Sequence, residues 1–133
     1  MHQQDIQAVA DIHTKAFSRQ QQSTLWIRCN FAAYPRIFLF VARNEQDQVV
    51  GYIQWSQKSG FRKEVVMELE QIAVLKNFQR SGIGTQLIKQ SIMQIKDFLS
   101  DTNSKLKAVM VTTRTDNGSE DIFGEKLHSL MHS

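Results

Sequence analysis

The sequence predicts an α/β domain with a mixed sheet flanked by helices, and three observations support this prediction. Apolar residues recur with a helical period near the start of the chain and again after residue 83. Runs at 37–43, 49–56 and 65–75 are rich in branched and aromatic residues, as strands are. The 133 residues contain no repeat and no low-complexity linker, so we expect one domain over 1–133.

The first third of the chain predicts two helices. Residues 5–17 carry apolar side chains at helical spacing, and Asp5 is a suitable N-cap. His13 lies near the apolar face of this helix, where a packing role is favoured over that of a catalytic base. After a polar loop, Thr24 can cap a second short helix, which must end before Pro35.

The middle of the chain predicts an antiparallel hairpin. The strand at 37–43 leads through a polar turn into the strand at 49–56. Gly51 interrupts the second strand, which indicates either a bulge or the close approach of another group. A third strand follows at 65–75, before the longest helix.

The second half of the chain predicts a β-α-β unit. The helical stripe after the third strand consists of Ile83, Leu87, Ile88, Ile92, Ile95 and Leu99. A strand at 108–113 and a terminal helix within 117–132 follow. The expected order is therefore α-α-β-β-β-α-β-α. A crossover helix implies that the strands at 65–75 and 108–113 are parallel, in an otherwise antiparallel sheet.

The join between the third strand and the long helix has the composition of an anion site. Residues 79–84 read Q-R-S-G-I-G. Glycines let the backbone approach a ligand closely, and the first turn of a helix presents unpaired N–H groups with a positive dipole end. Arg80 adds a side-chain charge, so a phosphate group is the most natural ligand.

Two familiar phosphate motifs do not fit this join. A P-loop requires Lys-Ser or Lys-Thr after its last glycine, and none follows Gly84. A dinucleotide fingerprint requires a third small residue where Leu87 stands, and the chain is too short for a second βαβ half.

The strand, join and helix together resemble the acetyl-CoA-binding motif of the GNAT superfamily of N-acetyltransferases. The family pattern is Gln/Arg-x-x-Gly-x-Gly/Ala, and it matches residues 79–84, with I-A-V at 72–74 before it. The resemblance extends from residue 5 to about residue 127. It implies the GNAT fold, in which the cofactor sits in a V-shaped gap between two parallel strands.

The resemblance implies an enzyme that transfers an acetyl group from acetyl-CoA to a primary amine of a small molecule or protein. The alternative is a catalytically weak module that binds or senses acyl-CoA. The implied cofactor-binding residues are Ile72, Ala73, Val74, Gln79, Arg80, Ser81, Gly82, Ile83, Gly84, Thr85 and Asn117. In this scheme the amides of 79–85 hold the pyrophosphate, and the backbone of Ile72 and Val74 holds the pantetheine. Asn117 either contacts the pantetheine or makes a turn.

Two acidic residues are candidates for activating the amine. An alkyl ammonium has a pKa of about 10.4, so a proton acceptor is needed at neutral pH. Glu68 and Glu70 precede the motif, and two-residue spacing puts them on the same face as Ile72 and Val74 unless a bulge intervenes. Many family members carry a glutamate at one of these positions. A solvated sheet face or an ion pair is the alternative, and Glu68 is slightly preferred.

Two features depart from the family pattern. The family often supplies a tyrosine from the terminal helix as general acid, but Gly124 stands at that position and no tyrosine follows Tyr52. Family members also usually have a strand before the first helix and two strands after the last one. We therefore expect an under-covered sheet edge, which a second subunit would cover in a homodimer.

The composition favours a cytoplasmic protein that binds neither nucleic acid nor membranes. The net charge is only +3, and no basic run is interleaved with aromatic residues. No apolar run approaches the roughly 18 residues of a membrane span. We expect Cys29 to be a buried core thiol. His128 and His132 lack a third ligand, so no metal is expected.

Overall fold

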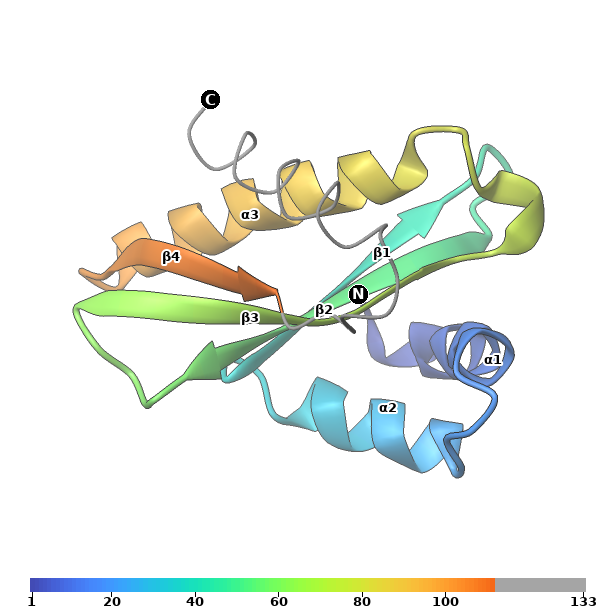
Figure 1. The fold of residues 1–133 in the computed structure, drawn as a ribbon, viewed down its shortest axis with the longest axis horizontal. Helices are drawn as coiled ribbons and strands as arrows, with labels where there is room; N and C mark the ends of the chain where they lie inside the picture. Colours follow the sequence, from blue (N-terminus) through green and yellow to red (C-terminus); the bar gives the residue numbers. More distant parts are fainter. Residues whose placement is uncertain (112–133) are drawn as a thin grey trace.

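The computed structural model describes residues 1–111, which form one sheet with helices on both faces. A long helix covers one face, and two shorter helices lie against the other (Figure 1). The elements in chain order are η1 (Gln3–Asp5), α1 (Ile6–Ala16), α2 (Ser23–Ala32), β1 (Ile37–Arg43), β2 (Val49–Lys58), β3 (Glu64–Val74), η2 (Lys76–Phe78), α3 (Ile83–Asp101) and β4 (Lys105–Val111). The terminal helix predicted within 117–132 lies outside the described residues.

The strand order in the sheet is β1-β2-β3-β4. β1 pairs antiparallel with β2, and β2 pairs antiparallel with β3, whereas β3 and β4 are parallel with α3 as their crossover. These pairings confirm the predicted hairpin and the predicted β-α-β unit. Among the described strands, β1 lies at one edge of the sheet. The homodimer expected to cover such an edge stays a prediction, which light scattering can test.

Each face of the sheet carries its own hydrophobic core. The core under α3 contains Phe38, Ile53, Trp55, Val65, Met67, Leu69, Leu87, Ile88, Ile92, Ile95 and Leu99. The core under α1 and α2 contains Val9, Ala10, Ile12, Ile27, Leu39, Tyr52 and Ala73. The α3 members of the first core include the predicted helical stripe from Leu87 to Leu99. Within residues 1–111, no helix is both long enough and apolar enough to cross a bilayer.

A buried histidine fixes the loop between α1 and α2. His13 Nδ1 lies 2.7 Å from Ser23 Oγ, and His13 Nε2 lies 2.7 Å from Gln20 Oε1. These contacts confirm the predicted packing role of His13. The predicted cap at Thr24 is wrong, because α2 already begins at Ser23 and follows Gln22, which has a left-handed backbone with φ of 55°.

The strand predicted at 108–113 is present at 108–111, but its predicted start is wrong, and so is the predicted burial of Cys29. The last described strand begins at Lys105, three residues before the predicted strand at 108–113, because its pairing with β3 already starts there. Cys29 is exposed, although we expected a buried thiol. α2 turns Ile27 and Asn30 toward the interior, and this leaves Cys29 on the outer side of the helix.

Gly51 has both properties that its position in a strand predicts. The pairing of β1 with β2 skips Val50, which makes a bulge directly beside the glycine. A Cβ atom at Gly51 would lie 3.0 Å from the carbonyl oxygen of Ala73 and 3.2 Å from Cγ2 of Val74. The close packing of β2 against the end of β3 therefore favours glycine here.

Asp5 ties the start of the chain to the end of β1. Its carboxylate accepts hydrogen bonds from Arg43 Nη2 at 2.7 Å and from the His2 amide at 2.8 Å. Asp5 is the N-cap residue of α1, as predicted, but its side chain makes no capping hydrogen bond to that helix. Burial alone would raise the pKa of Asp5, but these two hydrogen bonds and the charge of Arg43 together lower it.

This lowered pKa predicts a pH-dependent contribution to stability. An aspartate whose pKa is lower in the folded than in the unfolded state stabilises the fold above the unfolded value of about 3.9. That contribution is lost as the pH falls through the folded-state value. Asp5→Asn should therefore destabilise the protein at pH 7, and the difference from wild type should shrink below about pH 4.

Thermal unfolding of the two proteins between pH 3 and pH 7 measures this difference. Asp97→Asn, on the exposed side of α3, is the control and should change stability by less than about 0.5 kcal/mol throughout. A difference between Asp5→Asn and wild type that is the same at every pH would contradict the assignment.

Candidate functional site

A β-bulge interrupts β3 at Glu70. Gln71 pairs with Gln54 of β2 and Leu69 pairs with Trp55, so Glu70 has no opposite residue. The extra residue reverses which face the following side chains point to. Before the bulge, Leu69 points into the core under α3, whereas after it Ile72 and Val74 pack against that core.

The bulge corrects the predicted position of the two glutamates. Because Leu69 faces α3, its neighbours Glu68 and Glu70 point to the opposite face, which α1 and α2 cover. Ile72 and Val74 are on the α3 face. The expectation that all four residues share one face is therefore wrong, because a bulge intervenes at Glu70.

The two glutamates have different partners. Lys58 Nζ lies 2.9 Å from Glu68 Oε2, in an ion pair that leaves 19% of the glutamate side chain exposed. Glu70 is exposed, and its Oε2 accepts a hydrogen bond of 2.5 Å from Gln54 Nε2. Gln54 Oε1 in turn accepts a hydrogen bond of 3.0 Å from Asn30 Nδ2 on α2.

The end of β3 directs part of its backbone away from β2. The Leu75 amide donates to the Val50 carbonyl at 2.8 Å, which makes this a hydrogen-bonded pair. Such pairs alternate in an antiparallel ladder, so the backbone groups of Ile72 and Val74 point toward the β4 side. In the described part of the chain, β4 pairs with β3 only as far as Leu69. The described pairing with β4 thus ends before Ile72 and Val74.

The turn after β3 brings the strand end to the start of α3. Gln79 Nε2 donates to the Val74 carbonyl at 3.0 Å, and Ser81 Oγ donates to the Phe78 carbonyl. Arg80 and Gly82 both have left-handed backbones, with φ of 69° and 84°. These hydrogen bonds and backbone angles bring the turn back against the end of the strand.

The N-terminus of α3 has the features of an anion site. No side chain caps this helix, so its first amides have no partner within the helix. The left-handed φ of Gly82 favours a residue without a Cβ. Gly84 differs, because its φ is ordinary and a Cβ there would meet no atom within 4 Å. Nothing in the described fold requires glycine at 84, and its lack of a side chain leaves open space over the helix start.

The described structure brings most of the predicted cofactor residues into one continuous strand, turn and helix. Ala73 differs from its neighbours, because its side chain lies in the core under α1 and α2 and its backbone pairs with β2. Ile72 and Val74 are left as the residues whose backbone points to the β4 side of β3. Asn117 lies outside the described residues, as does Gly124 at the position of the missing tyrosine.

Sequence reasoning missed Gln54 and Lys58, which contact the two glutamates, and Asn30, which contacts Gln54. Of these residues, Gln54 could have been singled out from the sequence, because it is a polar residue within the apolar run V-V-G-Y-I-Q-W. Within residues 1–111, no three histidine, cysteine, aspartate or glutamate side chains lie close enough to hold a metal. His128 and His132 are outside this range.

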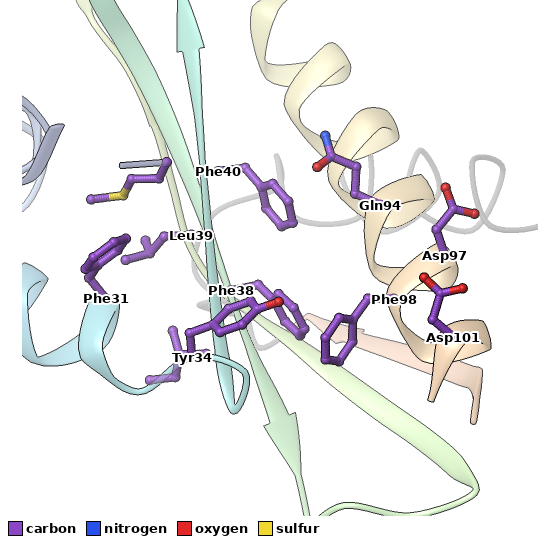
Figure 2. A pocket seen from close by; sticks show the side chains of 11 residues that line it. Phe31, Tyr34, Phe38, Leu39, Phe40, Gln94, Asp97, Phe98 and Asp101 are labelled. Carbon is purple, nitrogen blue, oxygen red and sulfur yellow. The ribbon is translucent and has the colours of Figure 1, made fainter. Parts of the chain in front are cut away.

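A hollow of about 740 Å³ lies elsewhere, along the edge strand β1 (Figure 2). Figure 2 shows the rings of Phe38 of β1 and of Tyr34, which follows α2, beside Phe98 of α3, with Asp97 and Asp101 on the same helix. The rings of Phe38 and Phe98 are 5.3 Å apart. None of the predicted site residues lines this hollow, and β1 is at the opposite edge of the described sheet from β4.

Several solved structures resemble this fold. A possible acetyltransferase from Clostridium difficile has a TM-score of 0.75 at 17% identity, over 96% of this chain and 86% of that one. An aminoglycoside 6'-N-acetyltransferase from Acinetobacter haemolyticus has a TM-score of 0.73 at 21% identity, over 96% and 86% of the two chains. An aminoglycoside 6'-N-acetyltransferase complexed with coenzyme A has a TM-score of 0.62 at 16% identity, over 72% of this chain and 51% of that one.

At these identities the structural matches show a shared fold. A comparison with curated proteins found no match. The acetyltransferase (GNAT) family model matches residues 6–123, which include all of the strand, turn and helix described above. This match covers most of the chain and shows that it belongs to the GNAT family of acetyltransferases.

Proposed function

We propose that this protein is an N-acetyltransferase that moves an acetyl group from acetyl-CoA to a primary amine. The observation that carries the proposal is the uncapped start of α3, with open space at Gly84, beside a strand end where the Ile72 and Val74 backbone points away from β2. Membership of the GNAT family supports the reaction class. A structural neighbour in complex with coenzyme A supports the choice of acyl donor.

In this proposal the glycine turn holds the pyrophosphate of acetyl-CoA. The amides of residues 79–85 donate to its oxygens, and the positive end of the α3 dipole and the Arg80 charge attract it. The backbone groups of Ile72 and Val74 hold the pantetheine arm as a further strand would. The Val74 amide then lies close to the thioester and stabilises charge that develops on the carbonyl oxygen.

The reaction also needs a proton acceptor on the amine side. The acceptor ammonium loses one proton to a carboxylate, and its nitrogen lone pair forms the new bond to the acetyl carbon. The carbon–sulfur bond breaks, and the sulfur leaves with the electron pair as a thiolate. The nitrogen then releases a second proton, which reaches the thiolate through water. Glu68 and Glu70 are the candidates for the carboxylate, on the face covered by α1 and α2.

Primary amines of small molecules are the first acceptors to test. The similar aminoglycoside 6'-N-acetyltransferase from Acinetobacter haemolyticus acts on such a compound, which favours a cationic small-molecule acceptor here. A suitable panel contains an aminoglycoside, a polyamine, an α-amino acid and a peptide with a free N-terminus. Release of thiol from acetyl-CoA measures turnover. Turnover with at least one amine is expected, whereas tight acetyl-CoA binding without turnover would favour the sensing module instead.

Substitution of Gly84 should separate ligand binding from folding. Gly84→Asp places a carboxylate in the open space over the helix start, where it would repel a phosphate, and should weaken acetyl-CoA binding at least about tenfold. Gly84→Ala is the matched control: it adds one methyl group without charge and should leave the melting temperature at or above that of wild type. Isothermal titration calorimetry measures both affinities. Equal affinities of the Asp and Ala variants would place the phosphates elsewhere.

Arg80 should contribute to binding at the expense of stability. Its left-handed backbone is strained for a residue with a Cβ, so Arg80→Gly should stabilise the fold by about 1 kcal/mol while weakening acetyl-CoA binding. Arg80→Asn removes the same charge, but asparagine relieves less of the strain. Urea denaturation of both variants measures the change in stability, and calorimetry measures the change in affinity for acetyl-CoA. If Arg80→Gly is no more stable than wild type, the strain is absent, and unchanged affinity would remove Arg80 from the site.

A further inference from the structure

We propose that the outer edge of β1 and the hollow beside it form a docking groove for an extended, basic peptide segment of another protein. In this segment apolar side chains and a lysine or arginine lie on the same face, and the segment adds to the sheet as a further strand next to β1. The inference does not depend on the proposed acetyltransferase function, because β1 is at the opposite edge of the described sheet from β4.

The outer backbone groups of β1 have no strand partner among the described residues. The Gln57 amide donates to the Arg36 carbonyl at 2.9 Å, which makes these two residues a hydrogen-bonded pair at the start of the ladder. Such pairs recur at every second residue of an antiparallel ladder, so Leu39 and Val41 direct their N–H and C=O groups away from β2. Backbone groups at a sheet edge are a template for an added strand.

The hollow of about 740 Å³ lies where a neighbouring strand would lie. Its lining comes from both faces of the sheet, since Phe38 belongs to the core under α3 and Leu39 to the core under α1 and α2. Figure 2 shows Phe40 and Leu39 on opposite sides of β1. A cavity on one face of a strand would be lined by alternate residues only. The hollow therefore extends around the outer edge of β1.

A second hollow of about 420 Å³ continues along the rest of β1. It shares Met1, Phe40 and Gln94 with the first hollow and reaches Arg43 at the end of the strand. β1 has 7 residues, so at ~3.3 Å per residue the two hollows together follow roughly 23 Å of strand. A groove of this length fits an extended peptide better than a compact small molecule.

Two carboxylates give the groove its preference for a cationic partner. Asp97 and Asp101 line the first hollow, about one helical turn apart on the exposed side of α3. Within residues 1–111, neither belongs to an ion pair. The chain as a whole has a net charge of +3, so its overall field favours anions. The attraction of a basic side chain is therefore local to this hollow.

Aromatic rings provide the apolar part of the groove. The rings of Phe38 and Phe98 are 5.3 Å apart, and Tyr34 stands edge-on to them at 5.4 and 5.8 Å. Tyr34 is nevertheless 59% exposed. An apolar side chain of an added strand would cover these rings. A lysine two residues further along the same face of that strand would then lie on the side of the α3 carboxylates.

A second copy of this chain fits the groove less well. Pairing of two β1 strands about a two-fold axis would extend the sheet and put both α3 helices on the same face. Asp97 and Asp101 of the two copies would then line one joined groove, where like charges repel. The homodimer is therefore the competing occupant of this edge.

A pair of synthetic peptides tests the charge preference. The probe is a capped, fluorophore-labelled heptapeptide in which threonine alternates with lysine, phenylalanine, leucine and lysine, and the control carries glutamate in place of lysine. Fluorescence anisotropy should show binding of the lysine peptide, and the glutamate peptide should bind at least about tenfold more weakly. Equal binding of the two peptides, or no binding of the lysine peptide, would overturn the proposal.

A double variant tests the two carboxylates. Asp97→Asn combined with Asp101→Asn should weaken binding of the lysine peptide at least about fivefold and leave the melting temperature close to that of wild type, because both side chains are exposed. Asp11→Asn, on the exposed side of α1 and outside both hollows, is the matched control and should leave the affinity unchanged. An equal loss in the control would show an unspecific charge effect and count against the groove.

N-Methylation of the lysine peptide tests whether it adds as a strand. Successive amides of an extended peptide point to opposite edges, and only one edge can face β1. Methylation of the amides on one edge should therefore abolish binding, whereas methylation on the other edge should not. Hydrogen exchange gives a second readout, since the amides of Leu39 and Val41 should exchange at least about tenfold more slowly with the peptide bound. Equal effects of the two methylated peptides, or no protection of these amides, would contradict strand addition.

Val41→Pro tests the edge from the side of the protein. It removes an amide that points away from β2, and proline is tolerated on edge strands. This variant should lose peptide binding, whereas Val41→Thr should keep it, and neither should change the oligomeric state in light scattering. Should Val41→Pro fail to fold, the methylated peptides carry the same test. A wild-type dimer that a folded Val41→Pro variant converts to a monomer would assign the edge to a second copy and overturn the peptide proposal.

Discussion

The arrangement of the site depends on one irregularity, the unpaired residue in β3 at Glu70. A regular strand would have kept Leu69 and Gln71 on the same face of the sheet, with Glu70, Ile72 and Val74 on the other. The bulge instead turns Ile72 and Val74 toward α3 and leaves Glu70 and Gln71 facing α1 and α2. One added residue thus separates a backbone surface suited to an acyl donor from a carboxylate suited to an amine.

The two faces of the sheet have complementary chemistry around this point. On the α3 side, the uncapped helix start and the left-handed turn offer amides and positive charge. On the side of α1 and α2, buried amides lead to an exposed carboxylate. In the proposed function, the anionic acetyl-CoA therefore meets the amides and the positive end of α3, and the cationic amine meets a carboxylate.

Most of the fold could be predicted from the sequence because its signals are local. The helical stripe of α3, the hairpin and the parallel crossover each follow from periodicity and from chain connectivity. The anion-site character of the turn at 79–84 could also be predicted, because glycines allow close approach of the backbone and a helix start presents free amides in any fold. The bulge was not predictable, because it is a property of two strands: only the register against Gln54 and Trp55 reveals that Glu70 is unpaired. Cys29 was misjudged for a similar reason, since burial on a short helix depends on how that helix is docked.

The bulge also separates the folding of the strand from the placement of one carboxylate. Without Glu70, Leu69 would be followed directly by Gln71, and regular alternation would keep Leu69, Ile72 and Val74 on the α3 face and Gln71 and Ala73 on the other face. The shortened strand could therefore pair with β2 without a bulge, and no other side chain of β3 would change face. The extra residue thus serves to place the Glu70 side chain, because the faces of its neighbours do not depend on it.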